Sequence, residues 1–504
     1  MRDEGRRMSK LRVTQSAHQA DLSLGHAPHA GLGHVSYGGS TERRELAALH
    51  AELRFWALLA AGSLAIAGAF GFLLAVSRVP GSETIVHWPM EFFSKGLVIH
   101  VIFSLVVWFL AMFALLTSFA TIEIAPGMPR WAPAGRLGLV LVAMSFPMLF
   151  VPAFGEETVA TLNNYVPAII HPSYYLGLVS LAVGILLPVL RLFANVAFFT
   201  GRLEGLVASM TAAGVVYCVA LGAFIASLYV SWGEDPSRIM HEHLFWGGGH
   251  LLQFLNCLLM LTGWYVLARD LFGRDVIDPD AFRLSVALVG LFALLAVPFY
   301  FVFDPFSAEQ TEAFRRLQFL LAFPSLLIAV HGLLGVVRHA QVRSLPWRDP
   351  GFMALVLSPV AFGVGGIMGL LITGSDTRTP AHYHGVIAGV NLACMGLMLT
   401  YCLPRLDRPV SSGTGLRLQI TLFGLGQLLG SIGLFLAGGY GAPRKTPSGV
   451  VELANGAVIG MTLHGIGALL AIIGGVMFVA TVLTALLLRG AATRRGLSGS
   501  RPVQ

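Results

Sequence analysis

The sequence predicts an all-α polytopic membrane protein with twelve transmembrane helices. Of its 504 residues, 55% are hydrophobic and only 12% are charged, and the mean hydropathy is +0.74. Apolar runs of about 20 residues, the length that crosses a bilayer as a helix, recur along the chain. This composition excludes a soluble globular protein. The four cysteines lie singly within apolar runs, so neither a disulfide framework nor a thiolate metal site is indicated.

Each apolar run predicts one helix, and polar or Gly/Pro-containing connections separate the runs. Residues 1–53 are polar and lack apolar periodicity, which predicts a flexible cytoplasmic tail. We expect a twelve-helix membrane domain at 54–489 and a second cytoplasmic tail at 490–504. The expected spans are 55–77, 97–120, 135–155, 166–190, 204–230, 243–268, 282–303, 316–337, 351–374, 382–403, 416–438 and 456–488.

The basic residues predict the orientation of these spans. Loops after even-numbered spans hold more arginine and lysine than loops after odd-numbered spans, and the latter also carry Glu156, Glu157, Glu234 and Asp235. Basic loops stay on the cytoplasmic side, so both termini should be cytoplasmic. The net charge of +7 is therefore explained by membrane topology, and no nucleic-acid partner is expected.

Five histidines fall near the predicted outer ends of even-numbered spans. They are His100, His250, the pair His382 and His384, and His464. Residues at i and i+2 leave a helix about 200° apart, so the pair could hold two different planar metal groups. An ionisable residue inside a span costs about 2.5 kcal/mol or more, which makes each histidine a functional hypothesis. One histidine alone could equally be a hydrogen-bonded core residue, whereas a shared level predicts ligands of one cofactor layer.

Several motifs, in a fixed order, resemble subunit I of the haem–copper oxidase superfamily, which includes cytochrome c oxidases and nitric oxide reductases. The resemblance runs from the first span to the last. It rests on three stretches: Trp246-Gly247-Gly248-Gly249-His250; Gly363-Val364-Gly365-Gly366-Ile367-Met368-Gly369 followed by Asp376 and Ala381-His382-Tyr383-His384; and Gly441-Ala442-Pro443-Arg444-Lys445.

The resemblance implies two haems, one low-spin and one high-spin. His382 would be the proximal ligand of the high-spin haem, and His384 would ligate the low-spin haem opposite His100. His250 would bind the active-site copper or non-haem iron. Neutral imidazole is a favoured axial ligand of haem iron, which suits these assignments.

Arg444 and Lys445 would neutralise haem propionates, because the family carries a basic pair at this place in an outer loop. Without a haem they would simply be interfacial charges. The glycines of the ninth span likewise have a second interpretation, since small residues commonly allow close helix packing in membranes.

The match fails at the seventh span, where the family has an adjacent His-His pair that completes the copper site. This chain has Phe299 and Tyr300 there, and one imidazole is a poor site for a divalent ion. The ligand count therefore argues against copper or non-haem iron, unless another histidine replaces the missing pair. The candidates for replacement are His241, His243 and His331.

Other catalytic parts of the family also differ. Phe254 stands where many oxidases have a cross-linked tyrosine, which leaves Tyr300 as the candidate catalytic tyrosine. No lysine lies in the eighth span and no glutamate lies inside the sixth, so the lysine and glutamate proton routes of pumping oxidases are not visible. The glutamates typical of nitric oxide reductases near the sixth-span histidine are absent as well.

Three functions follow as hypotheses. The first is an oxidoreductase in a bacterial-type inner membrane that passes electrons from a periplasmic cytochrome c, a quinol or a subunit II through the low-spin haem to the high-spin haem, where O₂ or NO is reduced. The second is a copper-less haem subunit that transfers electrons or binds gas without oxidase turnover. A transporter is the third, but the two-half similarity common among transporters is not apparent, and a transporter leaves the histidine level unexplained.

Overall fold

The computed structural model describes residues 40–77, 91–273, 276–411, 413–444 and 453–488. Within these residues, twelve helices are long and apolar enough to cross a membrane. The twelve predicted spans and the all-α membrane architecture are thereby confirmed. The chain is a multi-pass membrane protein.

Seven spans are single α-helices. They are α2 (Ser40–Ser77), α6 (Pro172–Val196), α7 (Gly205–Val230), α8 (Arg238–Phe272), α13 (Pro350–Leu370), α16 (Thr414–Gly439) and α17 (Asn455–Leu487). Helix α2 begins before the boundary at residue 53 that we expected for the N-terminal tail. Residues 1–39 and 489–504 lie outside the described residues.

The other five spans are assembled from shorter pieces. The second and tenth spans each contain a π-helical turn, and the third ends in a 3₁₀ turn. The second span consists of α3 (Phe92–Val101), η4 (Ile102–Val107) and α4 (Trp108–Ile124), and the third of α5 (Ala132–Phe150) and η5 (Val151–Phe154). The seventh consists of α9 (Pro279–Leu294) and α10 (Phe299–Val302), and the eighth of α11 (Ala308–Leu317), η6 (Gln318–Leu321) and α12 (Ala322–Ala340). The tenth consists of α14 (Arg378–Leu397), η7 (Met398–Cys402) and α15 (Leu403–Arg405).

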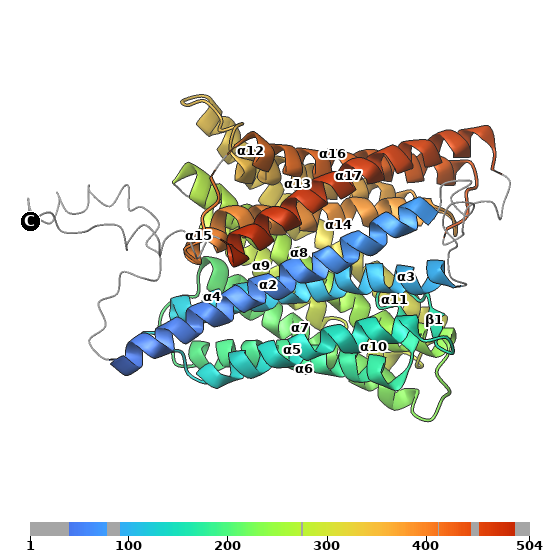
Figure 1. The fold of residues 1–504 in the computed structure, drawn as a ribbon, viewed down its shortest axis with the longest axis horizontal. Coiled ribbons are helices and arrows are strands. Elements are labelled where there is room, and N and C mark those ends of the chain that lie inside the picture. Colours follow the sequence, from blue (N-terminus) through green and yellow to red (C-terminus); the bar gives the residue numbers. More distant parts are fainter. Residues whose placement is uncertain (1–39, 78–90, 274–275, 412, 445–452, 489–504) are drawn as a thin grey trace, which may run out of the picture.

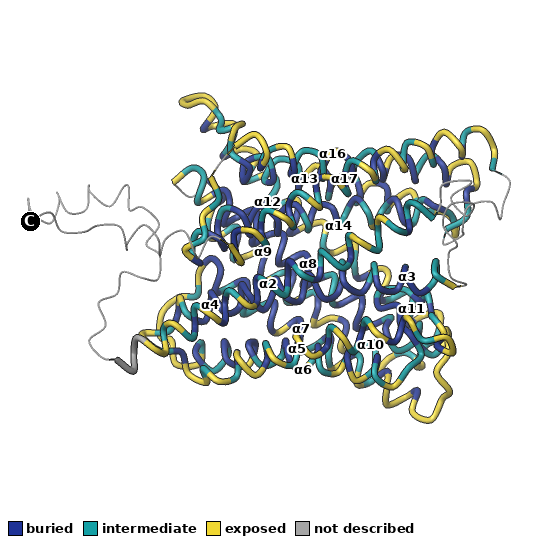
Figure 2. Tube along the Cα trace, viewed as in Figure 1, coloured by how far each residue is buried: buried dark blue, intermediate teal, exposed yellow. Residues whose placement is uncertain are grey.

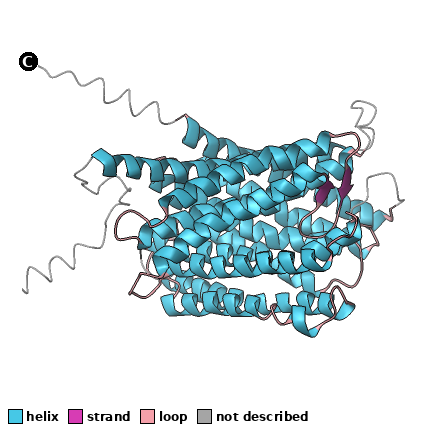
Figure 3. Cartoon of the chain, turned by 90° about the horizontal axis from the view of Figure 1, so that it is seen from below, coloured by secondary structure: helices cyan, strands magenta, loops and turns pink. Residues whose placement is uncertain are grey.

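A β-hairpin stands where the sequence predicted the start of the fourth span. Strand β1 (Val159–Thr161) pairs antiparallel with β2 (Ala168–Ile170), and α6 begins only at Pro172. Hydropathy alone joined the apolar residues of β2 to the helix that follows them. The hairpin lies at one end of the bundle (Figure 3), opposite the end where α2 begins and α17 finishes (Figure 1).

Three spans form the centre of the bundle. In the most apolar stretches of the second, sixth and tenth spans, 72%, 94% and 78% of the residues are buried, against 22–44% in the other nine. Figure 2 shows this burial around α8 in the middle of the molecule. The three central spans carry His100, His250, His382 and His384, so the candidate ligands lie on the helices with the least lipid exposure.

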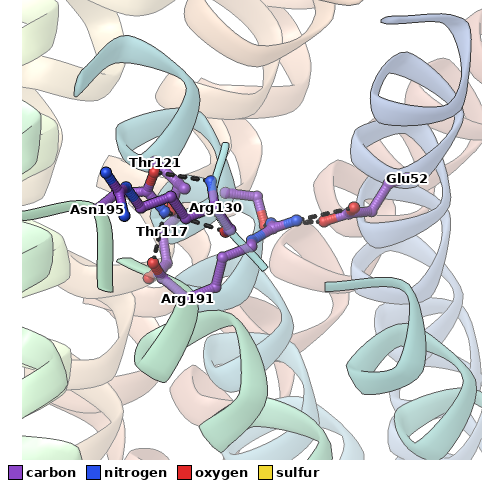
Figure 4. Close-up of polar contacts among 7 residues, drawn as sticks. Glu52, Thr117, Thr121, Arg130, Arg191 and Asn195 are labelled. Carbon is purple, nitrogen blue, oxygen red and sulfur yellow. Dashed lines mark hydrogen bonds and ion pairs between the residues drawn. The ribbon is translucent and has the colours of Figure 1, made fainter. Parts of the chain in front are cut away.

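A buried ion pair ties the first span to the fourth (Figure 4). Arg191 of α6 donates to both carboxylate oxygens of Glu52 on α2, at 2.6 and 3.0 Å, and to Ser118 Oγ on α4 at 2.9 Å. Both charged side chains are at most 1% exposed. Gly135 of α5 lies against the pair, where a Cβ would overlap both side chains. The pair therefore joins four helices.

We expect Glu52→Ala to destabilise the protein by about 3–5 kcal/mol, because it leaves the Arg191 guanidinium buried and uncompensated. The double variant Glu52→Leu/Arg191→Met should be much less destabilised, since it removes both charges. Thermal unfolding in detergent measures both. Equal stability of Glu52→Ala and the wild type would contradict the assignment of this pair as a structural contact.

Candidate functional site

Helix registers bring the candidate histidines to one level. The second, sixth and tenth spans run in the same direction through the bundle. Trp108 Nε1 of α4 donates to Asn391 Oδ1 of α14 at 2.8 Å, and counting eight residues back along both helices places His100 beside residue 383. With a rise of about 1.5 Å per residue, His100 lies within one turn of the pair at 382 and 384.

Counting residues from a contact between α8 and α14 gives the level of His250 in the same way. Gly263 of α8 packs against Ala393 of α14, where an added Cβ would lie 2.8 Å from the alanine Cβ. Counting thirteen residues back along both helices brings His250 level with residue 380, two positions from His382. The common level that the sequence predicted is therefore present in the packing of the three central spans.

His100 is held by the first span. Its Nδ1 lies 2.8 Å from the carbonyl oxygen of Ala67 on α2, and a Cβ at Gly71 would lie 3.0 Å from the imidazole ring. A carbonyl can only accept, so Nδ1 carries the proton and the lone pair lies on Nε2. This is the tautomer that metal-ligating histidines commonly adopt.

His382 is held in the same way by the ninth span. Its Nδ1 donates to the Gly365 carbonyl of α13 at 2.8 Å, and a Cβ at Gly369 would lie 2.5 Å from that nitrogen. Gly365 also packs directly on Gly385 of α14. Two glycines of the motif thus seat the histidine and bring the helices together. Gly363 and Gly366 have open space around them and are explained by neither role.

His384 lies beside His464, the member of the predicted histidine level to which the resemblance gives no ligand role. The imidazole of His464 on α17 packs against it with ring centroids 6.2 Å apart, and His464 Nδ1 is 3.2 Å from the Gly430 carbonyl of α16. His464 therefore has a polar contact with a neighbouring helix, and it also adjoins a candidate haem ligand.

Both ring nitrogens of His250 have protein partners. Nδ1 donates to the Trp246 carbonyl at 2.7 Å, and Nε2 accepts from the Tyr165 hydroxyl at 2.9 Å. The residue is 2% exposed. Tyr165 lies at the tip of the β-hairpin and was not singled out from the sequence, because its contact spans 85 positions of the chain.

Aromatic side chains occupy the remaining surroundings of His250. The rings of Trp246 and Phe314 lie 4.7 and 5.8 Å from its imidazole. The ring of Tyr300 packs edge-on against Phe314, with ring centroids 5.8 Å apart, and its hydroxyl lies 3.4 Å from the Ala223 carbonyl oxygen. The structure thus places Tyr300 in the aromatic cluster but gives it a backbone partner on α7.

Two of the three histidines considered as replacement ligands, His241 and His243, have other contacts. His241 bonds Thr161 Oγ1 at 2.7 Å and the Tyr175 hydroxyl at 3.1 Å, and His243 stacks on Phe306. Among the described residues, no group of three or more His, Cys, Asp or Glu side chains could hold a metal ion.

The loop that carries Arg444 is joined by backbone contacts to the residues just before α14. Asp376 forms an isolated antiparallel bridge with Pro443, and the Thr377 amide donates to the Ala442 carbonyl at 3.0 Å. This arrangement puts Arg444 at the end of the bundle that carries the histidines. Lys445 lies outside the described residues.

A further arginine lies at this contact between the loop and α14. Arg378 donates to both carboxylate oxygens of Asp376, with the shortest bond at 2.6 Å. These bonds hold the pKa of Asp376 below its ordinary value, so the carboxylate stays charged. Arg378 lies four residues before His382, a spacing that could have drawn attention to it from the sequence.

The residues present fit haem ligation but not a second metal. His100 and His382 have seated rings and the tautomer with its lone pair on Nε2, and glycines leave room around them. On His250, the corresponding nitrogen accepts from Tyr165, and further ligand side chains do not surround it in the described part of the chain.

Comparison with known proteins identifies the family. The family model described as Cytochrome C and Quinol oxidase polypeptide I matches residues 53–477. An uncharacterised protein of Aquifex aeolicus is 30% identical over 348 residues, 69% of this chain and 83% of the relative. An uncharacterised protein of Rickettsia prowazekii is 25% identical over 84% of this chain and 94% of its own length.

Two characterised neighbours agree with this match. Cytochrome c oxidase subunit 1 of Thermus thermophilus is 30% identical over 240 residues, 42% of each chain. A heme-copper terminal oxidase dimer solved by cryo-electron microscopy has the same fold, with a TM-score of 0.67 and 16% identity over 91% of this chain and 85% of that chain. The chain therefore belongs to the cytochrome c and quinol oxidase polypeptide I family, the subunit I proteins of the haem–copper oxidases.

Proposed function

We propose that this protein is a haem-carrying respiratory oxidoreductase subunit with two haems in the layer of its outer histidines. His100 and His384 would hold a low-spin haem, and His382 a high-spin haem. When bound, the haems supply one-electron redox chemistry and an iron that takes O₂ or NO. The observation that carries this proposal is that His100 and His382, on two central helices at one level, each donate Nδ1–H to a helix carbonyl.

The chain's own residues would orient the haems and set their charge balance. His384 and His382 leave α14 on opposite sides, so one helix would hold both groups close together for electron transfer. Electrons would arrive from a periplasmic cytochrome c, a quinol or a subunit II docked at the outer end. Arg444 and Lys445, with Arg378 nearby, would neutralise propionates at that end.

The expected setting is a bacterial-type inner membrane with both termini in the cytoplasm. Two observations support it: the basic loops after even-numbered spans, and the start of α2 and the end of α17 at the same end of the bundle (Figure 1). Residues 1–53 and 490–504 would be cytoplasmic tails, apart from the first turns of α2. Membrane lipid surrounds the nine outer spans.

A second candidate function is electron transfer or gas binding without oxidase turnover. It is favoured by the hydrogen bonds on both nitrogens of His250, because a haem without a second metal binds O₂, CO or NO but lacks a partner that supplies an electron at the ligand. Steady-state oxidation of reduced cytochrome c and of quinol separates the two functions. Rapid oxidation supports the first, and slow oxidation with tight gas binding supports the second.

We expect His100→Ala and His384→Ala each to remove the sharp reduced α band of the low-spin haem and to leave a five-coordinate haem signal, because one axial ligand is lost. Optical spectra of the purified variants measure this. His171→Asn, at the outer start of α6, is a matched control that keeps the helix cap. Unchanged spectra in both alanine variants would remove the basis for the bis-histidine assignment.

The doubly neutralised variant Arg444→Gln/Lys445→Gln should have lower haem potentials than the wild type. Charge-assisted bonds to a partly buried carboxylate are worth about 1.5–3 kcal/mol, and their loss leaves the haem anions less compensated. Redox titration followed optically checks this. Arg238→Gln, at the outer start of α8, controls for the general loss of outer charge; wild-type potentials in the double variant would leave the pair with a topological role only.

Elemental analysis of the purified protein should give two irons per chain, both as haem, and no stoichiometric copper. The His250→Ala variant should have the same metal content, because His250 already has two protein partners. One copper or one non-haem iron per chain in the wild type, lost in His250→Ala, would show that the second metal is present.

A further inference from the structure

The β-hairpin between the third and fourth spans is fixed to the outer turns of α8. Thr161 Oγ1 bonds His241 Nδ1 at 2.7 Å, and Glu242 accepts from both the backbone amide and the side-chain amide of Asn164, at 2.9 and 2.5 Å. The hairpin tip then reaches Trp246 and His250, one and two turns further along α8. Residues 242, 246 and 250 share one helix face, so the hairpin follows a single stripe of α8.

Local structure gives Tyr165 one defined position at this tip. Its φ of 64° is left-handed, a conformation that costs energy for a residue with a Cβ. Asn163 Nδ2 donates to the Val166 carbonyl at 2.7 Å and stabilises the tight turn. Gly249 makes the approach possible, because a Cβ there would overlap the Tyr165 side chain. The strained turn and Gly249 together place the Tyr165 hydroxyl next to His250.

The phenol takes the only lone pair that His250 could offer to a metal. Nδ1 of His250 is protonated because it donates to the Trp246 carbonyl, which leaves Nε2 as the acceptor for the Tyr165 hydroxyl. Burial raises the pKa of the Tyr165 phenol, so the hydroxyl keeps its proton. A neutral hydroxyl can donate to His250 or, by rotation about its C–O bond, to another acceptor nearby.

A second polar group lies beside the phenol. The side-chain amide of Gln318 on η6 is a hydrogen-bond partner of Tyr165, and this bond lowers the pKa of the phenol against the larger effect of burial. A buried amide N–H requires an acceptor, so Gln318 is a second donor beside the phenol. His250 lies at the level of His382, so these donors are at the height at which the proposed high-spin haem would be held.

We propose that Tyr165, held on His250, stands in the position of a second metal and is the hydrogen-bond donor to a small ligand on the haem carried by His382. This inference rests on the proposed function, since it requires that haem. The reacting centre would then be a haem faced by a phenol, an imidazole and an amide. A ligand that carries negative charge would be stabilised there, whereas neutral CO would not.

Fluoride on the ferric high-spin haem and CO on the ferrous haem test this directly. A hydrogen bond to a charged acceptor is worth about 1.5–3 kcal/mol, so Tyr165→Phe should weaken fluoride binding by about tenfold or more. CO affinity should stay the same. Tyr175→Phe, which removes the matching hydroxyl on His241, should leave both affinities unchanged.

The outcomes separate the inference from the proposed function. Wild-type fluoride affinity in Tyr165→Phe, or an equal loss of fluoride and CO affinity, would overturn the role of the phenol. A wild-type protein without a five-coordinate haem would instead overturn the proposed function. If Tyr165→Phe fails to accumulate, the iron–fluoride stretching frequency of the wild type in H₂O and D₂O gives the answer: a difference supports a donor, and identical frequencies exclude one.

Discussion

Hydrogen bonds from imidazole Nδ1 to helix carbonyls are the interaction on which the candidate site depends. The hydrocarbon core offers no water to satisfy a polar ring, so each histidine there requires a protein partner. His100 uses a carbonyl of the first span and His382 a carbonyl of the ninth. Each bond fixes the ring, selects its tautomer and links a central helix to an outer one. The outer spans therefore orient side chains as well as separating the centre from lipid.

The sequence predicted the fold well because hydropathy reports lipid exposure directly. All twelve spans were predicted, since each requires about twenty apolar residues whatever it packs against. The shared level of the histidines was also predictable, because each lies near the start of a span whose direction follows from the loops. Two boundaries were less accurate. Helix α2 begins at Ser40, within polar sequence, and the apolar strand β2 precedes α6 without a change in hydropathy.

The contacts of Tyr165 and His464 could not be predicted in the same way. They depend on which helices are neighbours, and hydropathy carries no such information. The Trp-Gly-Gly-Gly-His stretch shows the difference. Its histidine resembled a metal ligand, whereas the structure shows glycines that admit side chains from other elements: Tyr300 and Phe314 at Gly247, Phe224 at Gly248 and Tyr165 at Gly249. The chain thus has the residues of the family motif, but aromatic side chains surround them.

The ion pair between Glu52 and Arg191 also bears on how the chain is assembled during synthesis. The two residues are 139 positions apart, and three further spans must be made before the arginine can meet the glutamate. Chains are made from the N-terminus, so Glu52 enters the membrane without its partner, where an uncompensated carboxylate is unfavourable. The buried pair can form only after the fourth span has been made. We therefore expect the first four spans to reach their final packing together.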